Sequence, residues 1–231
     1  MSDLKSQEIG YGEKIGSGGS DAILSSYFRN ILVNLHIDIT RFQALLDKYI
    51  ISQGIANNSA ELSTSRSALR RELMSMTMTW KVFIKGLMFL RVESMMISLI
   101  LYRDDNKTTV HDYEFKLVDD KSVEDSDDQP NVLATFFKEI LENLEIDEDQ
   151  HEEVFKEYLD HYVRFSKPGS SPNEQYTAKC SLRREISKAN ISWKVFMKGL
   201  IFLRTYKMII NLKLKHRNNL ITKHTKTLRF R

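Results

Sequence analysis

The chain of 231 residues contains one cysteine and three prolines, and it lacks long apolar runs. Cys180 has no partner within the chain, which excludes a secreted fold held together by internal disulfides. The cysteine and the six histidines show no CxxC or HExxH spacing, so we expect no metal site. No apolar run reaches the roughly 18 residues that cross a bilayer, and residues 1–20 lack the apolar segment of a signal peptide. We therefore expect a cytoplasmic protein without membrane contact.

Motifs that carry chemistry are also missing. The glycine-rich residues 10–19 are not followed by the GK[ST] of a phosphate-binding loop, and no GxSxG occurs. His111 and His224 are interpreted as half-buried structural residues rather than catalytic bases. We therefore expect no enzyme, no catalytic residue and no cofactor.

The strongest feature of the sequence is an internal repeat. Residues 69–91 read LRRELMSMTMTWKVFIKGLMFLR and residues 182–204 read LRREISKANISWKVFMKGLIFLR. These segments align without a gap at an offset of 113, and 14 of their 23 positions are identical. Upstream, residues 27–38 match residues 136–147 at an offset of 109. The sequence therefore predicts a tandem duplication of one folded module.

The repeat sets the domain boundaries. We predict a flexible tail over residues 1–20, a first module over 21–117, an acidic linker over 118–131 and a second module over 132–231. With 42% hydrophobic residues, the chain has enough apolar side chains to build a core.

The first part of each module reads as helical. Apolar residues recur at a helical period over residues 21–35. Asp38 is predicted to cap a second helix, and Asp147 to cap its counterpart in the second module. Residues 67–73 are predicted to begin a third helix after a polar loop.

A fourth helix is predicted in each module, with Thr79 and Ser192 as N-caps. Its aromatic stripe, which begins at Trp80 or Trp193, is interpreted as core. Glycine in the middle of a helix costs about 1 kcal/mol relative to alanine. The glycines at positions 86 and 199 therefore predict that another element packs closely against this helix.

After this helix, apolar residues alternate with other residues over 97–102 and 210–215, which predicts strands. Turns at residues 105–107 and 218–220 would lead back along a second strand. The fold class is therefore α+β and predominantly helical, with each module made of three to four helices and a β-hairpin. In outline this order of elements loosely resembles a winged helix.

Burial selects the hairpin register. A two-residue loop sets Ile97 opposite Glu114 and mixes the two faces. A three-residue loop pairs Ile97 with Phe115 and Ile210 with Leu228, and it gathers the apolar residues on one face. We predict the second register.

The net charge of the chain is only +3, but the charged residues are distributed very unevenly along the sequence. Residues 179–231 contain 15 lysines and arginines but one acidic residue, whereas residues 119–178 contain 17 acidic residues and five basic ones. The part of the first module that corresponds to 179–231, residues 66–118, carries nine basic and six acidic residues. The basic surface therefore belongs to the second module.

A basic surface of this kind favours binding to phosphates. The fourth helix has no Asn, Gln or Ser for reading base edges after its cap, so we expect little sequence discrimination. The candidate nucleic-acid-binding residues are Arg183, Arg184, Lys194, Lys198, Arg204, Lys213, Lys215, Arg217, Lys223 and Arg229.

Two functions fit this pattern. The first is a non-enzymatic nucleic-acid-binding protein, a pseudo-dimer in one chain that contacts the phosphate backbone through the basic helix and hairpin of its second module. The second is a structural assembly or adaptor protein whose diverged modules bind protein partners, including an acidic protein surface. Either function is compatible with a homo-oligomer.

Overall fold

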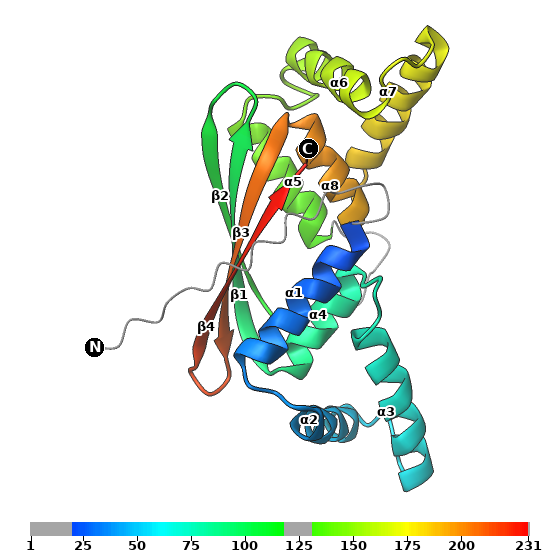
Figure 1. Ribbon diagram of the computed structural model, residues 1–231, viewed down its shortest axis with the longest axis vertical. Coiled ribbons are helices and arrows are strands. Elements are labelled where there is room, and N and C mark those ends of the chain that lie inside the picture. The colour runs from blue at the N-terminus through cyan, green and yellow to red at the C-terminus, as the bar shows by residue number, and fades with distance from the viewer. Residues whose placement is uncertain (1–19, 118–130, 231) are drawn as a thin grey trace, which may run out of the picture.

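The computed structural model describes residues 20–117 and 131–230, and it is an α+β fold with eight helices and four antiparallel strands (Figure 1). The predicted tail and acidic linker lie outside the described residues, apart from Ser20 and Asn131. The elements, in chain order, are α1 (Ser20–Asn34), α2 (Ile39–Ser52), α3 (Ser59–Leu73), α4 (Trp80–Phe89), β1 (Val92–Arg103), β2 (Thr108–Lys116), α5 (Val132–Asn143), α6 (Glu152–Ser166), α7 (Pro172–Ile186), α8 (Trp193–Phe202), β3 (Thr205–His216) and β4 (Ile221–Arg229).

The same order of four helices and two strands therefore occurs twice. As predicted, the side chains of Asp38, Thr79 and Ser192 accept hydrogen bonds from the first turns of α2, α4 and α8. The third helix is longer than predicted, because Asn58 caps it and it begins at Ser59.

The prediction for Asp147 is wrong. Its carboxylate accepts a hydrogen bond from the Asp149 amide at 2.8 Å, and this closes a turn before the helix. Helix α6 begins at Glu152, five residues beyond Asp147.

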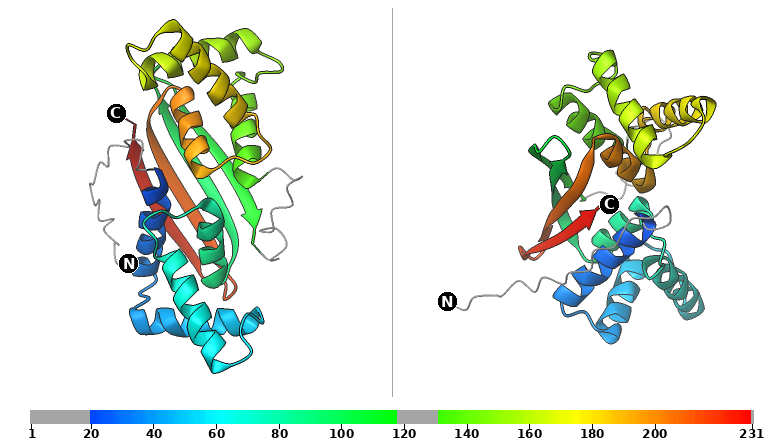
Figure 2. Two further views of the ribbon diagram at one scale, coloured as in Figure 1. Left: turned by 90° about the vertical axis from the view of Figure 1, so that its right-hand side faces the viewer. Right: turned by 45° about the horizontal axis from the view of Figure 1, so that its top comes forward.

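The two hairpins join into one sheet in the order β2-β1-β3-β4. Strands β1 and β3 are antiparallel neighbours, and Ser98 pairs with Asn211, the residue 113 positions later. Positions that correspond in the repeat therefore face each other at the centre of the sheet. The long strands β1 and β3 run side by side through the middle of the molecule (Figure 2).

The predicted hairpin register is wrong by two residues, although the two faces are assigned correctly. Ile97 pairs with Tyr113 rather than with Phe115. Each loop has three residues, 104–106 and 217–219, and its last residue is an asparagine with φ of 61°. Asparagine tolerates this left-handed conformation, which three-residue hairpin loops require at their last position, so Asn106 and Asn219 fix the register.

All eight helices lie on one side of the sheet, to its right in Figure 1. Helix α1 of the first half covers strands of the second half, because the Tyr27 hydroxyl donates to the carbonyls of Ile210 and His224 at 3.1 and 2.7 Å. Helix α5 of the second half covers a strand of the first half, where Phe136 packs on Tyr113 with ring centroids 5.3 Å apart. The two halves are therefore interlocked.

A single apolar core runs through both halves. Where the two halves meet, Trp80 and Trp193, which correspond in the repeat, stack on each other with centroids 5.9 Å apart and ring planes within 5°. A Cβ atom added at Gly86 would meet the Phe28 ring at 2.6 Å, and one added at Gly199 would meet the Phe137 ring at 2.5 Å. The close packing predicted from the two glycines is confirmed.

A chain of polar groups lies under β3 and β4 and includes two buried histidines. The Asn34 amide donates to Nδ1 of His224 at 3.1 Å, so the proton of the neutral ring is on Nε2, which faces the Thr222 hydroxyl at 3.1 Å. His216 contacts the same hydroxyl at 3.2 Å and the Leu90 carbonyl at 3.1 Å. This chain is satisfied when both rings are neutral.

Stability is expected to fall between pH 7.5 and pH 5.5 because of His224. Burial and then the charge of His216 lower the pKa of His224 to about 4, whereas an unfolded histidine titrates near 6.5. In this window the unfolded chain binds a proton that the folded chain does not, so the group removes about 1.3 kcal/mol of stability as the pH falls. Denaturant unfolding at several pH values measures the loss.

The matched variant for this measurement is His224→Gln, whose unfolding free energy should show a correspondingly weaker pH dependence. An NMR titration of the wild-type ring that gives a pKa near 6.5 would contradict the prediction.

Candidate nucleic-acid interface

The face of the sheet that points away from the helices is the candidate interface. Along β1 and β3 alternate side chains are buried under the helices, and the residues between them are partly or fully exposed on the other face. No described helix covers this outer face (Figures 1 and 2). We call it the open face. Its central residues on β1 and β3 are Met96, Ser98, Ile100, Tyr102, Lys207, Ile209, Asn211, Lys213 and Lys215.

Two cross-strand pairs of like charge lie on the open face of β3 and β4. Lys213 is directly opposite Lys223, and Lys207 is directly opposite Arg229. Within residues 20–117 and 131–230, Lys213, Lys223 and Arg229 form no ion pair. Like charges that face each other across a strand pair are destabilising. The two pairs are about 20 Å apart along β3, given a rise of about 3.3 Å per residue.

Aromatic side chains occupy one end of this face. Tyr206 is the extra residue at an irregularity in the β1–β3 pairing, and its side chain is 39% exposed. Its ring centroid is 6.4 Å from that of Tyr102. The Lys207 ammonium lies 4.4 Å from the centroid of Tyr102. The end of the sheet near the first hairpin loop therefore combines two rings with a cation.

Acidic residues border the opposite side of the face. Asp112 and Glu114 on β2 are exposed, and they are paired across the strands with Ser98 and Met96. Glu93 forms an ion pair with Lys215 at 3.4 Å. The open face is therefore basic over β3 and β4, and apolar and acidic over β1 and β2.

The structure places the ten predicted residues in two separate groups. Five belong to α7, α8 or the residues just after α8, which lie on the helical side of the sheet: Arg183, Arg184, Lys194, Lys198 and Arg204. The other five belong to the second hairpin. Four are on its strands, namely Lys213, Lys215, Lys223 and Arg229, and Arg217 is in its loop. The helix and the hairpin therefore do not form one continuous basic stripe.

Three residues of the helical group are neutralised inside the molecule. Arg183 donates to Glu148 at 2.5 Å, and this hydrogen bond raises the pKa of Arg183. Lys198 contacts Glu185 at 2.5 Å, as Lys85 contacts Glu72 at 3.0 Å in the corresponding place. Burial of Glu185 opposes its ionisation, but the hydrogen bond and charge of Lys198, together with the hydrogen bond from Ser181 and the charge of Lys188, outweigh burial and lower the pKa of Glu185.

Arg204 is the third of these residues. Its guanidinium donates to Glu157 at 2.7 Å and lies 4.6 Å from the centroid of the Tyr158 ring. The buried Arg103 lies over the same ring at 5.5 Å and donates to the Tyr158 hydroxyl. Arg204 therefore helps to fix the first hairpin loop against α6, whereas Arg184 and Lys194 stay exposed.

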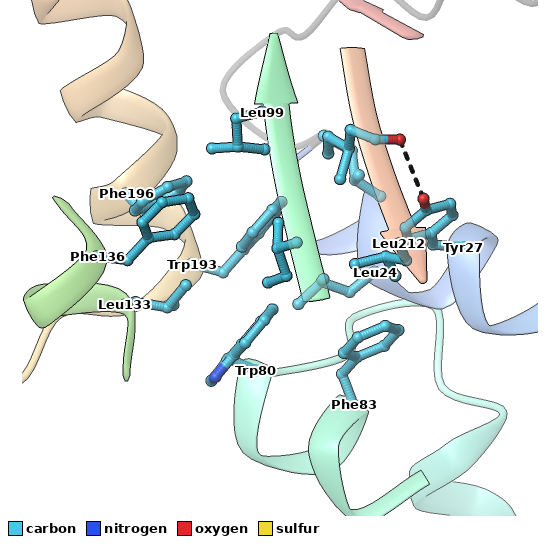
Figure 3. A pocket seen from close by; sticks show the side chains of 13 residues that line it. Leu24, Tyr27, Trp80, Phe83, Leu99, Leu133, Phe136, Trp193, Phe196 and Leu212 are labelled. Carbon is cyan, nitrogen blue, oxygen red and sulfur yellow. Dashed lines mark hydrogen bonds between the residues drawn. The ribbon is translucent and has the colours of Figure 1, made fainter. Parts of the chain in front are cut away.

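A small pocket lies where the two halves meet, between the helices and the sheet (Figure 3). The stacked rings of Trp80 and Trp193 form one wall, and Phe83, Phe196 and Leu99 contribute to the others. Its apolar lining offers no partner to an ion or a phosphate, so it is part of the core rather than of the interface.

The sequence-based prediction does not include Lys207 or the two tyrosines. The predicted alternation covers residues 210–215, whereas in the structure the same alternation begins at Lys207, directly after the bulge residue Tyr206. The sequence Thr-Tyr-Lys at the start of β3 contained the signal, since it ends in a basic residue beside an aromatic one.

The described residues contain no cluster of three or more side chains suited to a metal ion, and none of the described helices is long and apolar enough to span a membrane. No family model, curated protein or solved structure matches the chain.

Proposed function

We propose that the protein is a non-enzymatic nucleic-acid-binding protein that contacts the phosphate backbone through the open face of β3 and β4. The observation that carries this proposal is that residues of like charge lie opposite each other at two places on β3 and β4: Lys213 with Lys223, and Lys207 with Arg229. Each pair raises the free energy of the isolated protein, and an anion placed between the two cations removes the repulsion. A chain of phosphates supplies such anions at short intervals.

In this proposal the chain is a tandem duplicate that acts as a pseudo-dimer. Support comes from residues with positive φ that lie at corresponding positions of the two halves: His36 and Glu145, Arg91 and Arg204, and Asn106 and Asn219. The proposal does not depend on the winged-helix resemblance. The hairpins pair with each other along β1 and β3, and their shared outer face is the binding surface.

The alternative is an adaptor that binds an acidic protein surface. It uses the same unpaired cations, and the exposed Val110 on β2 favours an apolar contribution to such a contact. The two functions differ in selectivity, because a phosphate-binding face accepts polyanions of any sequence whereas an adaptor requires one partner surface.

Binding to nucleic acid is expected to weaken steeply with salt. Each phosphate contact contributes about −0.7 to the slope of log K against log salt on a single strand, and about −0.9 on a duplex. Three to five contacts therefore give a slope between about −2 and −4.5. Fluorescence anisotropy with labelled oligonucleotides of unrelated sequence, starting at about 50 mM salt, measures this slope. Absence of binding at that salt overturns the proposal in favour of the adaptor.

A further inference from the structure

The two halves of the open face differ in chemistry at corresponding positions. Ile100, Tyr102 and Val110 of the first half correspond to Lys213, Lys215 and Lys223 of the second. The face therefore offers apolar and aromatic side chains over β1 and β2 and cations over β3 and β4. A ligand that covers the whole face needs an apolar part beside an anionic part.

The acidic border argues against a duplex. A double helix presents phosphates along both of its strands, and a duplex laid across the sheet would bring phosphates to Asp112 and Glu114. Neighbouring strands are about 4.8 Å apart, so these carboxylates lie only about 10 Å from β3. A single strand avoids this repulsion, because its phosphates can follow β3 and β4 while its bases turn toward β1 and β2.

The aromatic end of the face suits unpaired bases. Tyr102 and Tyr206 lie side by side, and Tyr206 projects from the sheet as the bulge residue. At the corresponding place at the other end the bulge residue is Glu93, which pairs with Lys215 instead. Exposed aromatic rings next to cations form the stacking surfaces on which proteins hold single-stranded nucleic acid.

We infer that the open face binds single-stranded nucleic acid, with bases stacked on Tyr102 and Tyr206 and phosphates held by Lys207, Lys213 and Lys223. This inference rests on the proposed function and specifies its ligand. The strand follows β3 and β4 between the two like-charged pairs. Asp112 and Glu114 then face the bases. Their carboxylates accept hydrogen bonds from the exocyclic amino groups of the bases.

The test compares the affinities of the full chain for a single-stranded oligonucleotide of about 12 nucleotides and for the same sequence as a duplex. We expect tighter binding of the single strand. Tyr102→Ala should weaken single-strand binding by about 5- to 150-fold, since each stacked base contributes at this level. Its salt slope should stay at the wild-type value, because no phosphate contact is lost. Tyr102→Phe keeps the ring and should retain the affinity.

The matched control is Tyr176→Ala, which removes a tyrosine that is 71% exposed on α7 on the helical side. Circular dichroism melting of each variant checks the fold. Equal affinity for single strand and duplex, or an unchanged affinity of Tyr102→Ala, overturns the inference and leaves the proposed phosphate contact standing. Absence of binding to either oligonucleotide at about 50 mM salt overturns the proposed function as well.

Discussion

Trp193→Ala is expected to lower the free energy of unfolding by about 3–5 kcal/mol, the range measured for large aromatic residues replaced in protein cores. The indole is 6% exposed and packs on Trp80 and on Phe196. Because a single core runs through both halves, the whole chain should unfold in one transition at lower denaturant concentration. Denaturant melts followed by circular dichroism measure this change.

Two variants sharpen the measurement. Trp193→Phe keeps an aromatic ring and removes an indole N–H that has no hydrogen-bond partner among the described residues, so it should lose much less stability. In a double-mutant cycle with Trp80→Ala, the stacked rings should show a coupling of about 0.5–1.5 kcal/mol. Two separate unfolding transitions, or an unchanged midpoint for Trp193→Ala, would contradict the shared core.

The triple substitution of Lys213, Lys215 and Lys223 by alanine removes two of the proposed phosphate contacts, Lys213 and Lys223. It is expected to flatten the salt slope by about 1.4, at about −0.7 per phosphate on a single strand. A difference of this size corresponds to roughly a 30-fold loss of affinity at low salt, spread evenly over sequences. The thermal midpoint should change little, because removal of the repulsion between Lys213 and Lys223 offsets loss of the exposed ion pair between Lys215 and Glu93. Anisotropy titrations and thermal melts provide both measurements.

The charge-matched control replaces Arg71, Arg184 and Lys194 by alanine. These exposed residues lie on the helical side of the sheet, so the variant has the same net charge as the first triple substitution but an intact open face. Its salt slope should stay close to the wild-type value. A slope flattened as much as in the hairpin variant would move the interface to the helices.

The helices and the faces of the strands were predictable from the sequence because they depend on local signals. The caps Thr79 and Ser192 mark where α4 and α8 begin. The alternation of apolar residues in β1 and β3 shows which side chains share a face. The hairpin register was not predictable from burial, because a shift of two residues keeps every side chain on its own face. The left-handed conformation of Asn106 and Asn219 decided it.

The pairing of the two hairpins could not be predicted from the sequence for a different reason. Pairing of β1 with β3 depends on contacts between residues more than 100 positions apart, such as Ser98 with Asn211, for which the sequence has no local signal. Without this pairing, the sequence predicts that the basic helix and the basic hairpin contribute to one surface. The structure puts them on opposite sides of the sheet, and acidic residues such as Glu148 and Glu157 neutralise part of the helical group.

The interlocked cover of the sheet has a consequence for synthesis of the protein. When synthesis of β1 is complete, neither its neighbour β3 nor helix α5, which covers the β2 side, has been translated. At about 5–20 residues per second, roughly 5–20 s pass before β3 follows. During that time the apolar strand Val92–Arg103 has an unpaired edge, the feature that leads nascent chains to aggregate. We therefore expect the nascent first half to depend on chaperones until the second half has been synthesised.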